Sequence, residues 1–171
     1  MIEFGRFAAH NRARRGLGKP ETFNFLGFTL ICGISRRGKF LLKRKSRSDR
    51  MRAKLRETEE ELRRRHLSIP EQGQWLRQVV MGFFAYHAVP TNIEALAAFR
   101  NHVRRLWWRS LSRRSQRDET TWERCAKIAD EWLPKPKIFH PWPSDRFAVK
   151  HPRWEPYAGK PHVQICARGA Q

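Results

Sequence analysis

The chain has 171 residues, 40% of them hydrophobic, with a formal net charge of +20 and a pI near 11.3. This length excludes more than one ordinary domain or two small ones, and the apolar content permits a core. Such a charge stores self-repulsion that a bound polyanion relieves. Nucleic acid is the first candidate partner, an anionic membrane surface the second and a ribosomal-type structural role the third. A basic protein without a specific partner is less favoured, because the arginines cluster with aromatic residues, which can stack on bases.

Three widely separated cysteines, Cys32, Cys125 and Cys166, form no CxxC pair and predict neither a zinc ribbon nor a disulfide framework. A reducing, cytoplasmic setting fits this pattern. The first ten residues, MIEFGRFAAH, lack the architecture of a signal peptide. The longest apolar run, residues 79–89, is too short to span a bilayer and contains His87. We therefore expect a soluble, cytoplasmic protein.

The N-terminal third predicts β-structure. Residues 2–4 suggest a short strand, followed by a basic, glycine-bearing loop over residues 6–21. Residues 22–31 and 39–45 are rich in aromatic and β-favouring types and flank the turn-like sequence GISRRG, so we expect a β-hairpin. We expect a basic cluster at the tip of this hairpin, made of Lys43, Arg44, Lys45 and Arg47.

Four helical segments follow in the sequence. The first is expected from Ser46 or Ser48 to about His66, with a narrow apolar stripe and a charged outer face. After a connection over residues 67–72, a second helix runs from Trp75 to Pro90, where the proline stops it. Its expected apolar face comprises Trp75, Leu76, Val79, Val80, Phe83 and Tyr86.

The third helix is predicted to begin at Thr91, with Glu94 completing a capping box. Apolar residues three and four apart give it one buried side, made of Ile93, Leu96, Phe99, Val103, Leu106 and Trp107. Arg105, Arg109 and Arg113 fall on the opposite side as a row of guanidinium groups. Trp107 is expected in the core, whereas Trp108 lies nearer the basic side, where stacking on a base and core packing are both open.

A fourth helix is predicted from Thr120, capped with Glu123, to Leu133, where Pro134 ends it. Residues 134–157 alternate prolines with aromatic residues and suggest an extended, ordered segment that packs on the helices. Residues 158–171 are expected to fray. The predicted fold is therefore mainly α, a helical bundle with an N-terminal β-hairpin and an extended C-terminal segment.

No catalytic centre is legible in the sequence. The four aspartates are dispersed, whereas two-metal phosphoryl transfer needs converging carboxylates. The glutamates at 59–61 fit a solvated helix face, and His140, His151 and His162 are spaced too widely for a metal motif. The sequence GLGK at residues 16–19 lacks the spacing of a phosphate-binding loop. We expect no catalytic residue, metal or cofactor.

The basic clusters carry the functional prediction. The segment from Arg100 to Arg117 contains no acidic residue, whereas a face that serves only solubility would mix signs. We therefore favour phosphate binding over a merely solvated surface. The candidate RNA-binding residues are Arg100, Arg104, Arg105, Arg109, Arg113, Arg114 and Arg117 on the third helix and its end, Lys43, Arg44 and Lys45 on the hairpin, and Arg12, Arg14 and Arg15 in the first loop.

Several segments resemble the C-terminal part of group II intron reverse transcriptases, also called intron-encoded maturases, and the likeness covers almost the whole chain. The segments are IEFGRFAAHNRARRGLGKPETFNFLGFTLICG (2–33), GFFAYHAVPTN (82–92), LWWRSLSRRSQR (106–117), TWER (121–124) and FHPWPSDRFAVKHPRWEPYA (139–158). The resemblance implies that residues 1–45 correspond to the end of the polymerase palm, 46–133 to the helical thumb, or X, domain, and 134–171 to the maturase C-terminal segment.

The resemblance also implies roles. Phe25, Leu26, Gly27 and Phe28 are similar to the last block of the reverse-transcriptase domain, on the primer-grip side of the palm. In the family, thumb and palm clamp intron RNA and the template–primer duplex. The family's catalytic Tyr-Ala-Asp-Asp block lies upstream of the region corresponding to Ile2, so we expect no polymerase activity from this chain alone. We also expect no HNH endonuclease module after Tyr157.

The expected function is maturase-type binding of structured intron RNA, or of an RNA/DNA duplex, in support of splicing. Two alternatives stay open. The chain could belong to a split or mis-started RNA-directed DNA polymerase and complement a separate palm and fingers fragment. It could also be a non-functional remnant of a mobile element.

Overall fold

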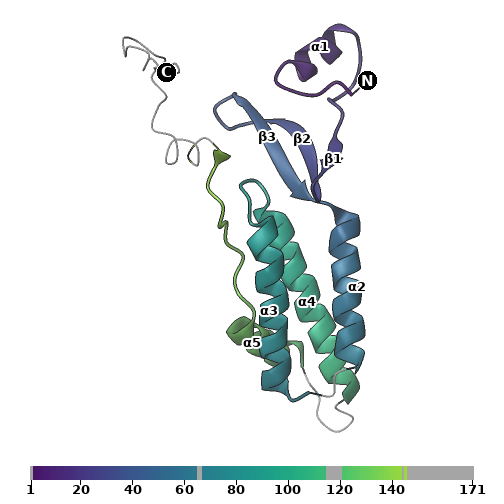
Figure 1. Cartoon of the computed structure of the whole chain (residues 1–171), viewed down its shortest axis with the longest axis vertical. Helices are drawn as coiled ribbons and strands as arrows, with labels where there is room; N and C mark the ends of the chain where they lie inside the picture. The colour runs from purple at the N-terminus through teal and green to yellow at the C-terminus, as the bar shows by residue number, and fades with distance from the viewer. Residues whose placement is uncertain (1, 65–66, 115–120, 144, 146–171) are drawn as a thin grey trace, which may run out of the picture. The chain divides into compact units, whose positions relative to one another are not determined.

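The computed structural model describes residues 2–64, 67–114, 121–143 and 145, and Figure 1 shows the order of its helices and strands. Residues 1–141 form one compact unit and residues 142–171 a second. All helices and strands named below belong to the first unit. Within the described residues, no helix combines the length and apolarity needed to cross a membrane.

Three long helices lie side by side in the first unit (Figure 1): α2 (Ser48–Arg64), α3 (Ile69–His87) and α4 (Ile93–Arg114). Helices α2 and α3 both pack on α4, and α5 (Trp122–Trp132) packs on α3 and α4. Their apolar stripes meet in one core, which confirms a mainly helical fold. The most deeply buried core residues are Leu62, Leu76, Val80, Phe84, Leu96, Phe99, Val103, Trp107, Cys125, Ala129 and Leu133.

Two interactions order this core. The rings of Phe83 and Phe99 stack with their centroids 3.8 Å apart, joining α3 to α4. The fully buried indole of Trp107 donates a hydrogen bond from Nε1 to Oε1 of Gln72 at 3.0 Å. This bond satisfies two polar groups that burial would otherwise penalise. The expectation that Trp107 belongs to the core is confirmed, whereas Tyr86, expected on the buried face, is 52% exposed.

Helix α3 begins at Ile69, earlier than the predicted start at Trp75, so the expected connection over residues 67–72 is mostly helix. Pro70 occupies the first turn, where the missing N–H leaves no helical bond unmade. The backbone N–H and the hydroxyl of Ser68 both donate to Oε2 of Glu71, at 2.9 and 2.6 Å. These bonds lower the pKa of Glu71. The capping box and a proline in the first turn therefore both fit a helix start at Ile69.

The predicted hairpin is part of a three-stranded antiparallel sheet in the order β1 (Phe23–Phe25), β2 (Phe28–Ile34) and β3 (Phe40–Ser46). The expected first strand over residues 22–31 is split by a two-residue turn at Leu26 and Gly27, whose φ angles are 43° and 77°. Two positive φ angles in succession are typical of the type I′ turn of tight hairpins. The pairing of β2 with β3 is confirmed.

The expectations for the extreme N-terminus are wrong. Residues 2–4 form no strand, and the expected loop contains helix α1 (Ala8–Arg14). The ring of Phe4 packs edge-on against Phe23 at 4.6 Å, so a side-chain contact holds this segment in place of strand pairing. The alanines of AAHNRAR are strong helix formers, and Gly16 follows the helix with a φ of 67°.

A buried polar network joins the sheet to the helices. At its centre lies Asn92, which is 1% exposed. Its side-chain oxygen accepts a hydrogen bond from the backbone N–H of Ser46 at 2.9 Å. Its side-chain nitrogen donates to the Ser46 hydroxyl and to the His87 carbonyl, both at 2.8 Å. The Ser46 hydroxyl also lies 3.0 Å from Nδ1 of His87. Burial lowers the pKa of His87. Three buried polar groups thus hold the end of β3 against α3 and α4.

The predicted capping box of Thr91 and Glu94 is wrong, since α4 begins at Ile93. Thr91 has a φ of 77°, and its hydroxyl accepts from the backbone N–H of Arg44 at 2.8 Å. The carbonyl of Asn92 instead accepts the first bonds of the helix. The threonine therefore binds the neighbouring strand and does not cap its own helix.

Helix α5 is capped by Thr121, whose side chain accepts from the backbone N–H of Arg124 at 3.3 Å; the predicted cap, Thr120, lies outside the described residues. Beyond the helix, residues 134–141 adopt neither helix nor strand. The backbone N–H groups of Phe139 and His140 donate to the carbonyl of Ala88 at 3.0 and 3.1 Å. This part of the predicted extended segment does pack on the helices, and residues 146–171 lie outside the described residues.

Candidate nucleic-acid interface

Helix α4 has one buried side and one cationic side, as its periodicity predicts. Leu96, Phe99, Val103 and Trp107 are fully buried, whereas Arg105, Arg109 and Arg113 are all exposed. Successive arginines of this row are four residues apart, about 6 Å along the helix axis. Among the described residues, no carboxylate pairs with Arg105 or Arg109. Within the described residues, Arg105 and Arg109 therefore present uncompensated positive charge.

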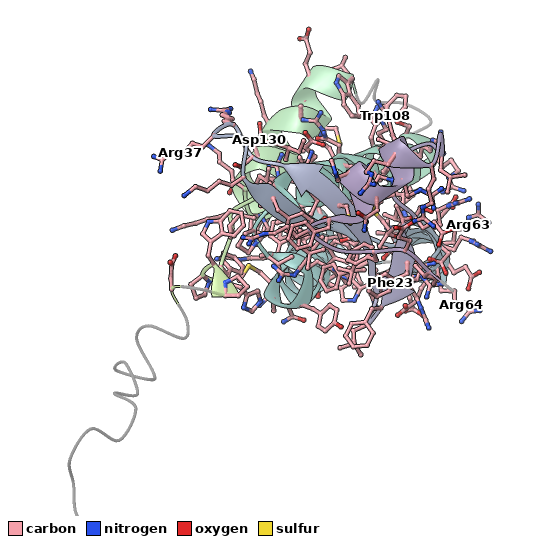
Figure 2. The ribbon with its side chains drawn as sticks, turned by 90° about the horizontal axis from the view of Figure 1, so that it is seen from above. Phe23, Arg37, Arg63, Arg64, Trp108 and Asp130 are labelled. Carbon is pink, nitrogen blue, oxygen red and sulfur yellow. The ribbon has the colours of Figure 1, made fainter. Side chains whose placement is uncertain are left out.

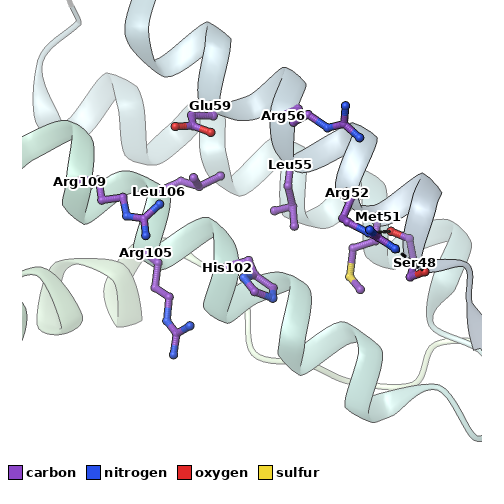
Figure 3. Close-up of a pocket in the computed structure, with 10 residues that line it drawn as sticks. All are labelled: Ser48, Met51, Arg52, Leu55, Arg56, Glu59, His102, Arg105, Leu106 and Arg109. Atoms are coloured by element: carbon purple, nitrogen blue, oxygen red, sulfur yellow. Dashed lines mark hydrogen bonds between the residues drawn. The ribbon is translucent and has the colours of Figure 1, made fainter.

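The row borders a groove between α2 and α4 with a volume of about 610 Å³, which we call the α2–α4 groove. Met51, Leu55 and Leu106 lie between the two helices, and arginines come from both (Figure 3). The described residues that line it are Ser48, Met51, Arg52, Leu55, Arg56, Glu59, His102, Arg105, Leu106 and Arg109. An apolar floor between cationic edges suits a ligand with both anionic and uncharged parts.

The groove is strongly positive. Of the described residues that line it, four are arginines and one is acidic, Glu59, which already pairs with Arg63 at 2.7 Å. The guanidinium of Arg52 is held by the hydroxyl of Ser48, at 3.1 Å, and by the carbonyl of the same residue. Cations brought together on a concave surface raise the local concentration of a polyanion. The sequence prediction missed Arg52 and Arg56, although their spacing of four residues places them on one face of α2.

Arg100, predicted to bind RNA, is only 8% exposed and belongs to the interior. Its Nη2 donates to Oδ1 of Asp130 at 2.7 Å and to the carbonyl of Leu133 at 3.2 Å. Its Nε donates to the carbonyl of Pro134 at 3.1 Å. The hydrogen bond from Arg100 also lowers the pKa of Asp130. This arginine ties α4 to the end of α5 and is removed from the candidate interface.

Two more arginines of α4 are also engaged within the protein. The guanidinium of Arg104 lies over the ring of Trp122, 4.7 Å from its centroid, in a cation–π contact. Arg114 donates to the carbonyls of Leu62 and Leu67 at 3.3 and 3.2 Å, and so binds the C-terminal end of α2. Arg117 lies outside the described residues. Of the predicted α4 cluster, Arg105, Arg109 and Arg113 remain on the exposed face.

The hairpin cluster lies elsewhere than expected. Lys43, Arg44 and Lys45 occupy the second half of β3, next to the helices, and not the hairpin tip. Lys43 and Lys45 are exposed on one face of the strand, while Arg44 is half-buried on the other. The tip instead carries Arg36 and Arg37, and Figure 2 shows Arg37, with Arg63 and Arg64 of α2, directed away from the ribbon.

The first basic cluster, expected in a loop, lies on and just beyond α1. Arg12 pairs with Glu21 at 3.5 Å and with Glu3 at 4.0 Å, and Arg15 also pairs with Glu3. Arg14 is exposed. Acidic partners therefore offset part of this cluster, in contrast to the α2–α4 groove.

The block that resembles a primer grip forms the β1–β2 turn. Phe28 is buried and stacks on the ring of Tyr86, with centroids 5.6 Å apart. The hydroxyl of Tyr86 donates to the carbonyl of Leu26 at 2.7 Å. Phe25 and Leu26 themselves are 58% and 68% exposed. Phe28 and the carbonyl of Leu26 thus secure the sheet to α3, whereas the side chains of Phe25 and Leu26 are exposed.

The cysteine, histidine and acidic side chains of the described residues are the remaining candidates for chemistry. No three His, Cys, Asp or Glu side chains within them gather to hold a metal ion. Burial raises the pKa of the Cys125 thiol, which disfavours the reactive thiolate. In the comparisons with known proteins, no family model, no curated protein and no solved structure matched the chain.

Proposed function

We propose that this chain binds structured RNA through the α2–α4 groove, and that it acts as a maturase-type domain which stabilises folded group II intron RNA for splicing in the cytoplasm. The observation that carries the proposal is the gathering of four arginines from two helices around one groove, where the one acidic residue of the described lining is already paired. The choice of RNA as the polyanion, and of intron RNA in particular, rests on the sequence resemblance to intron-encoded maturases. In this proposal α2 to α5 act as a thumb.

Phosphate contacts would supply most of the affinity. Each phosphate that an arginine neutralises releases condensed counterions, so the logarithm of the binding constant falls linearly with the logarithm of the salt concentration. Guanidinium groups also form bidentate hydrogen bonds with phosphate oxygens. The apolar floor of the groove would cover the sugar and base edges between phosphates. The protein's part is to hold the RNA in one folded arrangement, without a catalytic group of its own.

The proposal is tested by the salt dependence of binding to a group II intron transcript, measured by fluorescence anisotropy. We expect Arg105→Gln/Arg109→Gln to weaken binding and to reduce the slope by about 1 for each phosphate that the variant no longer neutralises. Arg52→Gln/Arg56→Gln, on the opposite wall, should act in the same direction. These substitutions leave the buried core unchanged, because all four side chains are on the surface.

The matched control is Arg36→Gln/Arg37→Gln at the hairpin tip, which removes the same charge from exposed positions outside the groove. It should lower affinity only through the electrostatic field of the whole protein, and leave the slope of affinity against salt concentration nearly unchanged. If the control and the groove variants lose affinity and slope equally, binding follows net charge and the groove is not the site. If wild-type protein shows no salt-sensitive affinity for the transcript, the RNA-binding function itself is refuted.

A further inference from the structure

A second hollow lies on the other side of the arginine row of α4. Its volume is about 440 Å³, and it is lined by Arg105, Trp108, Arg109 and Trp122. We call it the tryptophan hollow. Arg105 and Arg109 also line the α2–α4 groove, so these two side chains separate two adjoining concave surfaces. A ligand on the arginine row therefore has access to both.

The walls of the tryptophan hollow are aromatic. The rings of Trp108 and Trp122 stand perpendicular to each other, with centroids 5.7 Å apart and an interplanar angle of 90°. Trp108 is half-buried and packs against the core, and Trp122 is 37% exposed. The guanidinium of Arg104 lies over the Trp122 ring and contributes to its support. The pair is thus braced by its neighbours and keeps aromatic surface at the hollow.

We propose that the tryptophan hollow takes one unpaired nucleobase of the RNA bound along the arginine row. The inference rests on the proposed RNA binding and adds a preference for RNA with an unpaired nucleotide. Arg105 and Arg109, one helical turn apart, contact the phosphates on either side of that nucleotide. The base turns into the hollow and stacks on a tryptophan ring.

Charge complementarity selects this occupant. Among the described residues, the lining contains two cations and no carboxylate, which disfavours a cationic ligand. Aromatic rings bordered by arginines match a nucleotide, which has a flat uncharged base joined to an anionic phosphate. The base of a paired nucleotide is stacked inside the duplex, so only an unpaired one can enter without breaking a pair. The volume falls within the range of roughly 300–1,000 Å³ typical of small-molecule sites.

The test compares two RNA hairpins on the same protein. One carries a single unpaired adenosine in its stem, and the other carries an abasic nucleotide at that position, which keeps every phosphate. We expect wild-type protein to bind the first at least about five-fold more tightly, since stacking of one base on an aromatic side chain is worth that much or more. Trp122→Leu should bring the ratio of the two affinities close to one. Trp122→Phe, which keeps a ring, should retain much of the preference.

Using a ratio protects the test from folding defects, because a loss of active protein lowers both affinities equally. Phe7→Leu, at an exposed aromatic residue outside the hollow, is the control and should leave the ratio unchanged. If wild-type binding is salt-sensitive but the ratio is one, the base site is refuted while the phosphate groove stands. If Trp122→Leu keeps the wild-type ratio, the base binds elsewhere. Absence of salt-sensitive binding to either hairpin overturns both proposals.

Discussion

Two glycines of α3, Gly73 and Gly82, should respond in opposite directions to the same substitution. Gly73 is buried against α5, and a Cβ atom added there would lie 2.6 Å from both Cγ and Cδ2 of Trp132. Gly82 is exposed, and a Cβ atom added there would meet nothing within 4 Å. The pair therefore isolates the packing of α3 on α5 from the general preference of helices for alanine.

The magnitudes follow from these two environments. Replacing glycine by alanine inside a helix stabilises it by about 0.5–1 kcal/mol, which is the full expectation for Gly82→Ala. At Gly73 the overlap involves ring atoms close to the Trp132 backbone, so the ring cannot swing clear without moving α5. Overpacking of this kind costs about 1–3 kcal/mol. We expect Gly73→Ala to be less stable than the native protein by about 1–2 kcal/mol, and the two variants to differ by about 1.5–3 kcal/mol.

Urea denaturation followed by far-UV circular dichroism measures both free energies of unfolding, with the slope against urea checking that the transition stays cooperative. A double-mutant cycle with Trp132→Leu strengthens the test, because shortening the indole should remove most of the cost at Gly73. If Gly73→Ala is as stable as Gly82→Ala, α5 does not pack on this part of α3 and the reasoning is refuted.

Three further predictions concern the buried polar groups. Asn92→Ala should lower the free energy of unfolding by about 2–4 kcal/mol, because it leaves the buried partners of three hydrogen bonds unsatisfied. The control, Asn101→Ala on the exposed face of α4, should change this free energy by less than about 0.7 kcal/mol. The lowered pKa of His87 means that the unfolded chain binds more protons, so stability should rise with pH from the folded-state pKa of His87 up to the ordinary histidine pKa near 6.5, and be lost as pH falls through the folded-state pKa. Arg100→Met should cost about 1–3 kcal/mol of stability by freeing two carbonyls and Asp130, yet leave RNA affinity per folded molecule unchanged.

Each of these three predictions has an outcome that would contradict it. Equal stability of Asn92→Ala and Asn101→Ala would show that the sheet is not held through Asn92. A pH slope that persists in His87→Gln would assign the titration to another group. If Arg100→Met weakens RNA binding as much as Arg105→Gln does, Arg100 contacts the ligand and its internal bonds are not its main role.

Hydrophobic periodicity, together with caps and prolines, predicts the helices α2 to α5 and which side of α4 is buried. A spacing of three and four residues must bring Leu96, Phe99, Val103 and Trp107 to one side of a helix, whatever packs against it. The same geometry turns Arg105, Arg109 and Arg113 outward. The approximate extent of the hairpin and the apolar stripe of α5 follow from equally local rules, namely strand composition, turn residues and a terminating proline.

The tertiary structure alone decides what each polar side chain contacts. Arg100 and Arg105 are the same residue type on the same helix, but α5 and Pro134 surround one guanidinium and the α2–α4 groove borders the other. Thr91 looks like a helix cap in sequence, yet its hydroxyl accepts a hydrogen bond from the backbone N–H of Arg44 in strand β3. Local sequence sets the direction of a side chain, whereas its partner comes from a segment tens of residues away. The interface therefore becomes visible only when α2 and α4 are brought together.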